Sequence, residues 1–136
     1  MQTIANQLKV LIVDDSLLLR ERLACHLGKI DGITIAGKAS DVRGGIDTFH
    51  RLGPDVVVLD LQLPDGTGID VLEQIKRDRP STVVMILTNY PLSPLRKKCT
   101  EAGAEYFFDK TCEFGRVSEA LRDLIRTRSA PEVEQS

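Results

Sequence analysis

Three aspartates, a threonine and a lysine each follow a short apolar run in this sequence of 136 residues. Asp14 and Asp15 follow the run LKVLIV, and Asp60 follows VVVL. Thr88 follows VVMIL, and Lys110 follows YFFD. Carboxylates held together repel one another by about 4 kcal/mol per pair at ~4 Å and an effective dielectric constant near 20, so they share protons or bind a cation. An all-oxygen site of this kind suits Mg²⁺.

The remaining two polar groups extend this chemistry toward phosphate. A divalent cation, the Lys110 ammonium and the Thr88 hydroxyl around one carboxylate form the arrangement expected for stabilising a phosphoryl group during transfer. Asp60 can then act as the nucleophile, as in aspartyl-phosphate chemistry. Taken alone, each of these residues is more often a helix cap or a turn former, so the prediction depends on their conjunction.

Five short apolar runs that do not alternate with polar residues predict strands covered on both faces. They are Leu8–Val13, Ile33–Ala39, Val56–Leu59, Val83–Leu87 and Tyr106–Phe108. Between them, apolar residues recur every three or four positions, as on one face of a helix. These sets are Leu19/Leu23/Leu27, Val42/Ile46/Phe49, Leu72/Ile75, Leu95/Cys99/Ala102 and Phe114/Val117/Leu121/Leu124.

Capping residues agree with this alternation. Asp41 is predicted to cap the second helix. Ser93 is predicted to cap the fourth helix, with Pro94 as its first helical residue. The glycines expected where the first, second and fourth helices stop are Gly28, Gly53 and Gly103. The pattern predicts a doubly wound (βα)₅ α/β domain over residues 8–126 with a parallel sheet, between flexible tails at 1–7 and 127–136. Sites in such sheets form at the carboxyl ends of the strands.

Composition narrows the function classes. Eighteen basic and twenty acidic residues give a net charge of −2, which argues against a general attraction to nucleic acid or anionic membranes. The odd set of Cys25, Cys99 and Cys112 contains no C-x-x-C pair and lies in expected helices, so we interpret them as reduced thiols that pack as small hydrophobes. With no signal peptide and no stretch of ~20 apolar residues, we expect a soluble, cytoplasmic protein without membrane insertion.

Four stretches, LIVDDS, VVVLDLQLPDGTG, MILTN and YFFDK, occur in this order and resemble the receiver domain of two-component response regulators. The resemblance covers about residues 8–126 and implies a flavodoxin-like sheet with strand order 2-1-3-4-5. It implies that Asp60 accepts a phosphoryl group from a phosphohistidine on a sensor histidine kinase or a histidine phosphotransfer protein. It also implies that Mg²⁺ is held by Asp14, Asp15, Asp60 and the backbone carbonyl of Gln62.

The same resemblance assigns the switch. Lys110 would pair with the phosphoryl oxygens, Thr88 would move in to hydrogen-bond them, and Phe107 falls at the position of the family's switch aromatic. Gln62, Asn89 and Tyr90 fall at or beside positions that tune the site, and we predict that Tyr90 slows hydrolysis of the acyl phosphate.

Two positions depart from the family pattern. Asn89 is larger than usual, and Thr111 replaces the usual cis proline after Lys110. Because a cis bond to a non-proline residue costs about 2.5–4 kcal/mol, the placement of Lys110 is open at this stage.

The implied readout face consists of the fourth helix, the fifth strand and the fifth helix. Only about ten polar residues follow the fifth helix, so we expect a stand-alone receiver that is not a turnover enzyme, with no direct DNA binding. Its output would be a contact with a separate effector protein. Arg96, Lys97 and Lys98 would suit an acidic partner, although a solvated helix face is the more common role for such a run.

Three alternatives stay open from the sequence. An adaptor that works without phosphorylation could keep this fold and most of these residues. A metal-dependent phosphohydrolase would also use an aspartyl nucleophile, but Gln62 stands where its second carboxylate is needed. A flavodoxin-type FMN carrier needs a hydroxyl- and glycine-rich loop after the first strand, whereas this chain has the acidic VDDSLLL.

Overall fold

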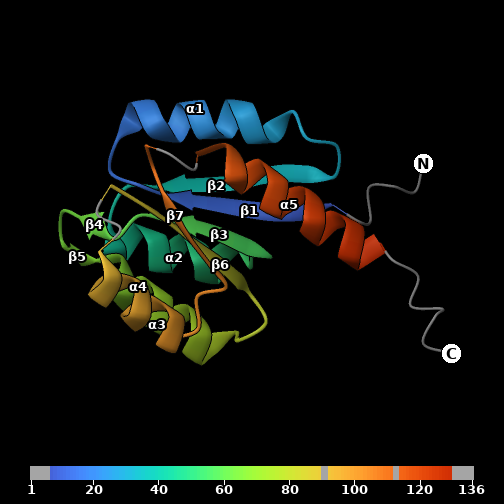
Figure 1. Ribbon diagram of the computed structural model, residues 1–136. Helices are drawn as coiled ribbons and strands as arrows, with labels where there is room; N and C mark the ends of the chain where they lie inside the picture. The colour runs from blue at the N-terminus through green and yellow to red at the C-terminus, as the bar shows by residue number, and fades with distance from the viewer. Residues whose placement is uncertain (1–6, 90–91, 112–113, 130–136) are drawn as a thin grey trace, which may run out of the picture.

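A five-stranded parallel sheet forms the centre of the computed structural model, which describes residues 7–89, 92–111 and 114–129. Its strand order is β2-β1-β3-β6-β7, so the predicted order 2-1-3-4-5 is confirmed (Figure 1). The strands are β1 (Leu8–Val13), β2 (Ile33–Ala39), β3 (Val56–Leu59), β6 (Val83–Thr88) and β7 (Tyr106–Asp109). Two of them run one residue further than predicted and include Thr88 and Asp109.

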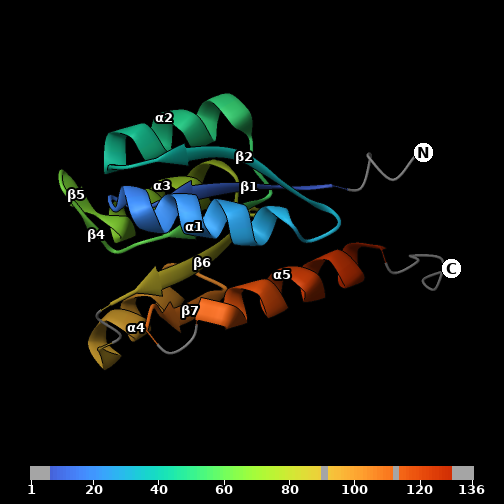
Figure 2. The same cartoon turned by 90° about the horizontal axis from the view of Figure 1, so that it is seen from above.

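Five helices cover the two faces of the sheet. They are α1 (Leu17–Gly28), α2 (Val42–Leu52), α3 (Gly68–Asp78), α4 (Ser93–Glu101) and α5 (Phe114–Ser129). Helices α1 and α5 pack on one face of the sheet (Figure 2). Leu23 of α1 and Leu121 of α5 belong to one buried cluster there. Helices α2, α3 and α4 cover the other face around Phe49, Leu72 and Cys99. Both faces are therefore apolar and buried, as the continuous apolar strands predicted.

Most helix ends lie where the sequence placed them. The Asp41 side chain accepts a hydrogen bond from the Gly44 amide at 2.7 Å, and Gly53 ends α2 with φ 56°. The predicted N-cap of α4 was wrong by one residue. Leu92 is the N-cap residue and its side chain makes no capping hydrogen bond, while Ser93 is the first helical residue. The amides of the first helical turn have no acceptor within the helix, so a proline is tolerated at any position of that turn. The position of Pro94 therefore does not determine at which residue α4 begins.

Three features differ from the prediction. A two-stranded antiparallel hairpin, β4 (Gln62–Leu63) and β5 (Gly66–Thr67), follows β3 and was not predicted. Helix α5 continues to Ser129, three residues beyond the predicted end, and the Thr127 hydroxyl donates to the Asp123 carbonyl at 2.9 Å. Cys25 is exposed, so only Cys99 of the described cysteines is the buried hydrophobe expected, and Cys112 lies outside the described residues.

Candidate functional site

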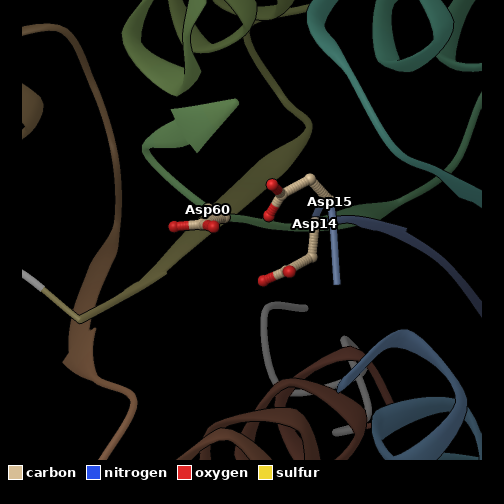
Figure 3. Close-up of side chains that lie close together, drawn as sticks. All are labelled: Asp14, Asp15 and Asp60. Atoms are coloured by element: carbon tan, nitrogen blue, oxygen red, sulfur yellow. The ribbon is translucent and has the colours of Figure 1, made fainter. Parts of the chain in front are cut away.

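The predicted acidic cluster forms at the carboxyl edge of the sheet. Asp14 directly follows β1 and Asp60 directly follows β3, and the two strands are neighbours. One carboxylate oxygen from each of Asp14, Asp15 and Asp60 lies within 4.8 Å of the others (Figure 3). Asp14 and Asp60 are only 2% and 3% exposed, whereas Asp15 lies at the open side. The cluster is therefore both buried and accessible from one direction.

Lys110 supplies the positive charge of this cluster. Its Nζ atom lies 2.7 Å from Oδ2 of Asp14 and 3.1 Å from Oδ2 of Asp60. The Lys110 amide donates to the Thr88 carbonyl at 2.8 Å, which fixes the backbone at the end of β7. No peptide bond in the described segments is cis, including the bond between Lys110 and Thr111. The lysine thus reaches both carboxylates from a trans peptide.

Asp109 does not join the acidic cluster, although it also ends a strand at this edge. Its Oδ1 atom accepts hydrogen bonds from the Thr111 amide at 2.9 Å and the Thr111 hydroxyl at 2.8 Å. Thr111 therefore shapes the turn after β7 by binding Asp109. Thr88 ends β6 and is fully buried, beside the strand that delivers Asp60.

Burial and charge shift the pKa values of the two central groups in the same direction. Burial raises the pKa of Asp60, the Lys110 charge opposes that effect, and the Asp14 charge adds to it. Burial alone would lower the pKa of Lys110, but the hydrogen bond to Asp14 and the charges of Asp60 and Asp14 raise it overall. Lys110 is one positive charge beside three carboxylates, so the cluster has a negative net charge that a bound cation would neutralise.

Three hydrogen bonds hold the loop that carries Asp14 and Asp15. The Ser16 amide donates to Oδ1 of Asp14 at 2.9 Å, and the Ser16 hydroxyl caps α1 by accepting from the Leu19 amide. Arg20, one turn into the helix, donates through Nη1 to the Asp14 carbonyl at 2.7 Å. The sequence analysis missed Arg20. Its only signal was a basic residue close to the aspartate pair.

The segment after Asp60 folds back tightly on the strand end. The Gln62 amide donates to Oδ1 of Asp60 at 3.2 Å, so the predicted metal-site residue begins the hairpin directly beside Asp60. Gly68 starts α3 so close to the strand end that a Cβ atom there would lie 2.2 Å from the Asp60 carbonyl oxygen. A glycine is therefore required where α3 meets the end of β3.

The remaining predicted site residues lie around this edge. Phe107 is 8% exposed and packs in the cluster under α4, with the Arg96 guanidinium carbon 4.5 Å from its ring centroid. Asn89 is exposed and lines a hollow of about 320 Å³ together with Leu18, Lys110 and other residues. The predicted role of Tyr90 stays a prediction because this residue lies outside the described residues.

The donor set fits Mg²⁺, which prefers carboxylate and carbonyl oxygens. Asp14, Asp15 and Asp60 each direct an oxygen into the same space, and the backbone of Gln62 is adjacent. Together, the doubly wound sheet and its acidic edge define a class of α/β protein with a cluster of carboxylates at the carboxyl ends of its strands.

Residues 10–122 match the family described as response regulator receiver domain, and the chain belongs to that family. Phosphorylation and Mg²⁺ binding are typical of these domains. One relative, a protein-glutamate methylesterase/protein-glutamine glutaminase from Treponema pallidum, is 40% identical over 123 residues, which are 89% of this chain and 30% of that protein. Response regulator protein VraR from Staphylococcus aureus is 29% identical over 127 residues, 93% of this chain and 61% of its own. This chain thus spans less than two thirds of each relative.

Solved structures agree with the fold. The response regulator domain of CheB from Thermotoga maritima superposes with a TM-score of 0.78 at 26% identity, covering 89% of this chain and 95% of its own. A chain in the CheX–CheY–BeF₃–Mg²⁺ complex from Borrelia burgdorferi gives 0.77 at 26% identity, covering 86% and 88%. None of the helices in the described segments has the length and apolar composition that crossing a bilayer requires.

Proposed function

We propose that Asp60 accepts a phosphoryl group from a phosphohistidine on a sensor histidine kinase or a histidine phosphotransfer protein. The observation that carries this proposal is the position of the Asp60 carboxylate, which is buried at a strand end where the Lys110 ammonium contacts both it and Asp14. The Asp60 side chain is only 3% exposed, and the neighbouring Asp15 is exposed, so a donor would reach Asp60 from the side of Asp15. Such an arrangement favours attack in one direction.

The transfer is a displacement at phosphorus. One carboxylate oxygen of Asp60 forms the new bond to phosphorus while the bond from phosphorus to the donor imidazole nitrogen breaks. The electron pair of that bond stays on the imidazole. Lys110 is placed to pair with a phosphoryl oxygen because its ammonium already contacts Asp60, and the Thr88 hydroxyl is the donor expected from β6.

A bound Mg²⁺ would be held by Asp14, Asp15, Asp60 and the backbone carbonyl of Gln62. It would neutralise charge on the carboxylates and on the phosphoryl oxygens. In its absence Lys110 is the only cation that the described structure places within salt-bridge distance of Asp14 or Asp60. We therefore propose that transfer depends on Mg²⁺.

The proposed output is a contact with a separate effector protein through α4, β7 and α5. Phosphorylation of Asp60 would draw Lys110 and Thr88 toward the phosphoryl group. Thr88 ends β6 and Lys110 directly follows β7, so both lie next to this surface. Exposed Arg96, Lys97 and Lys98 give α4 a basic side, which suits an acidic partner. The protein would act as a switch that catalyses its own labelling rather than as a turnover enzyme.

Intact mass spectrometry after incubation with a small-molecule phosphodonor tests the proposal. The wild type should gain one phosphoryl group with Mg²⁺ and none with chelator. Asp60→Ala should gain none under either condition, and Asp123→Ala, which changes an exposed aspartate on α5, should label like the wild type.

The outcomes separate the alternatives. Labelling of Asp60→Ala would show that another residue is the acceptor. No adduct on the wild type would overturn the proposal and favour an adaptor that works without phosphorylation. Steady release of inorganic phosphate from many donor molecules per chain would favour a phosphohydrolase instead.

A further inference from the structure

The hairpin that follows Asp60 is attached to helix α2 through its own turn. Pro64 and Asp65 connect β4 to β5, and the Asp65 carboxylate reaches the first residues of α2. Its Oδ1 atom accepts from the Val42 amide at 2.7 Å, and its Oδ2 atom accepts from the Arg43 amide at 3.2 Å. A single exposed side chain thus bridges two segments more than twenty residues apart in sequence.

These two amides are among those that a helix cannot satisfy internally. The first amides of an α-helix have no helical acceptor, and the helix dipole favours negative charge beside them. Asp41 satisfies the next amide, that of Gly44, at 2.7 Å. The hydrogen bond from Val42 lowers the pKa of Asp65, so the side chain is a carboxylate at neutral pH. Two aspartates therefore cap one helix end, and only one of them belongs to the hairpin.

The hairpin has few other attachments on its α2 side. Its residues are exposed except for Leu63, which packs in the buried cluster. On the other side, the Thr67 amide and hydroxyl form a capping box with Asp70 at the start of α3. Gly66 approaches α2 so closely that a Cβ atom there would lie 3.2 Å from Cγ2 of Val42. Asp65 thus attaches the turn of the hairpin to α2, and Gln62 begins the same hairpin beside Asp60.

We propose that Asp65 is a positioning residue for the metal site, because it ties the hairpin to α2 and so holds the Gln62 backbone beside Asp60. This inference rests on the proposed Mg²⁺-dependent phosphorylation. Both carboxylate oxygens of Asp65 accept hydrogen bonds from the Val42 and Arg43 amides, so we expect Asp65 to contact neither the cation nor the phosphoryl group. Its effect would appear as a weaker affinity for Mg²⁺, with little change in labelling once Mg²⁺ is saturating.

The experiment compares Asp65→Ala with Asp41→Ala. Both variants remove a cap from the same end of α2 and should lower Tm, but only the first releases the hairpin. Titration calorimetry should show a dissociation constant for Mg²⁺ that rises on the order of tenfold in Asp65→Ala and changes by less than about twofold in Asp41→Ala. Amide hydrogen exchange without Mg²⁺ should be faster at Gly66 and Thr67 in Asp65→Ala alone.

Labelling with a phosphodonor completes the comparison. The rate of Asp65→Ala at low Mg²⁺ should fall with its affinity and return to within about twofold of wild type at saturating Mg²⁺. Should Asp65→Ala fail to fold, Asp65→Asn keeps one acceptor for Val42 and should show an intermediate affinity.

Two results would overturn the inference. One is an unchanged Mg²⁺ affinity in Asp65→Ala, and the other is an equal loss in Asp41→Ala. In either case normal labelling of the wild type leaves the proposed function intact. A wild type that neither binds Mg²⁺ nor takes a phosphoryl group would overturn both.

Discussion

Lys110 and Asp60 form an ion pair in which Nζ lies 3.1 Å from Oδ2, and both side chains are largely buried. The two residues directly follow strands β7 and β3, and β6 lies between these strands in the sheet. The same ammonium group lies 2.7 Å from Asp14, so one lysine is shared by two carboxylates. A phosphoryl group on Asp60 would compete with Asp14 for this lysine, which couples the chemistry to the backbone beyond β7.

Replacing this lysine should slow phosphorylation. In Lys110→Met the labelling rate with a small phosphodonor at saturating Mg²⁺ should fall by about a hundredfold, because a preorganised positive charge on the phosphoryl oxygens is lost. The Lys110 charge lowers the pKa of Asp60, so its removal should raise that pKa. As the pH is lowered, labelling of Lys110→Met should therefore be lost at a higher pH than labelling of the wild type. Mass spectrometry over a pH series measures both effects. Lys97→Met, a change on the exposed surface of α4, is the control and should label normally.

Asp60 should oppose folding when the protein is free of metal. Burial and the Asp14 charge raise its pKa above that of the unfolded chain, so ionised Asp60 is less favourable in the folded state. The destabilising contribution of Asp60 should therefore disappear as pH falls through the raised folded pKa. Asp60→Asn should raise the free energy of unfolding at pH 7 by on the order of 1 kcal/mol. Urea unfolding measures this difference.

The gain should depend on pH and on the cation. It should shrink as pH is lowered, since wild-type Asp60 then becomes neutral in the folded state. It should also shrink with added Mg²⁺, because a ligand that binds only the folded wild type stabilises it. A variant that is less stable than the wild type at pH 7 without metal would contradict this reading of the site.

Much of this arrangement could be predicted because strand ends in a parallel sheet meet at one edge. The run before Asp60 is uniformly apolar, which identified a buried strand. The runs before Asp14 and Lys110 are apolar except for Lys9 and Asp109 and identified two more strands. The exposed position of Cys25 could also have been predicted. It lies two residues from buried Leu23, about 200° around the helix.

Other features carried no local signal. The hairpin strands Gln62–Leu63 and Gly66–Thr67 are each two residues long, too short for an alternating pattern. The contacts of Arg20 with the Asp14 carbonyl and of Asp65 with α2 depend on how neighbouring segments are oriented, which propensity and period do not specify. The last turn of α5 is polar, and composition alone does not distinguish a polar helix end from a tail.

Gly68 should be intolerant of any side chain. A Cβ atom there would lie 2.2 Å from the Asp60 carbonyl oxygen and 2.9 Å from Cα of Leu61, and backbone atoms cannot move aside cheaply. Gly68→Ala should lower the free energy of unfolding by about 2–4 kcal/mol and weaken Mg²⁺ binding.

Gly115→Ala in α5 is the matched control because nothing lies within 4 Å of its Cβ position. That change should be neutral or stabilise by up to about 1 kcal/mol. Urea unfolding and calorimetry would show the contrast, and equal effects of the two substitutions would count against the close packing of α3 on β3.

Arg96 should stabilise the buried position of Phe107. Its guanidinium group lies over the ring and approaches the Phe107 carbonyl at 3.5 Å, so it covers the aromatic from the solvent side of α4. Arg96→Ala should lower the free energy of unfolding by about 1 kcal/mol through the lost cation–π contact and packing. Lys97→Ala, one residue along the same helix, should change it by less than about 0.5 kcal/mol.

Arg96→Lys separates charge from shape in this contact. A lysine keeps the positive charge but lacks the planar group that stacks on a ring, so it should recover only part of the loss. Urea unfolding of the three variants at one pH measures the ranking. Full recovery by lysine would mean that the charge matters more than the stacking. No loss in Arg96→Ala would mean that α4 holds Phe107 in place through Leu95 and Cys99 alone, which pack in the same buried cluster.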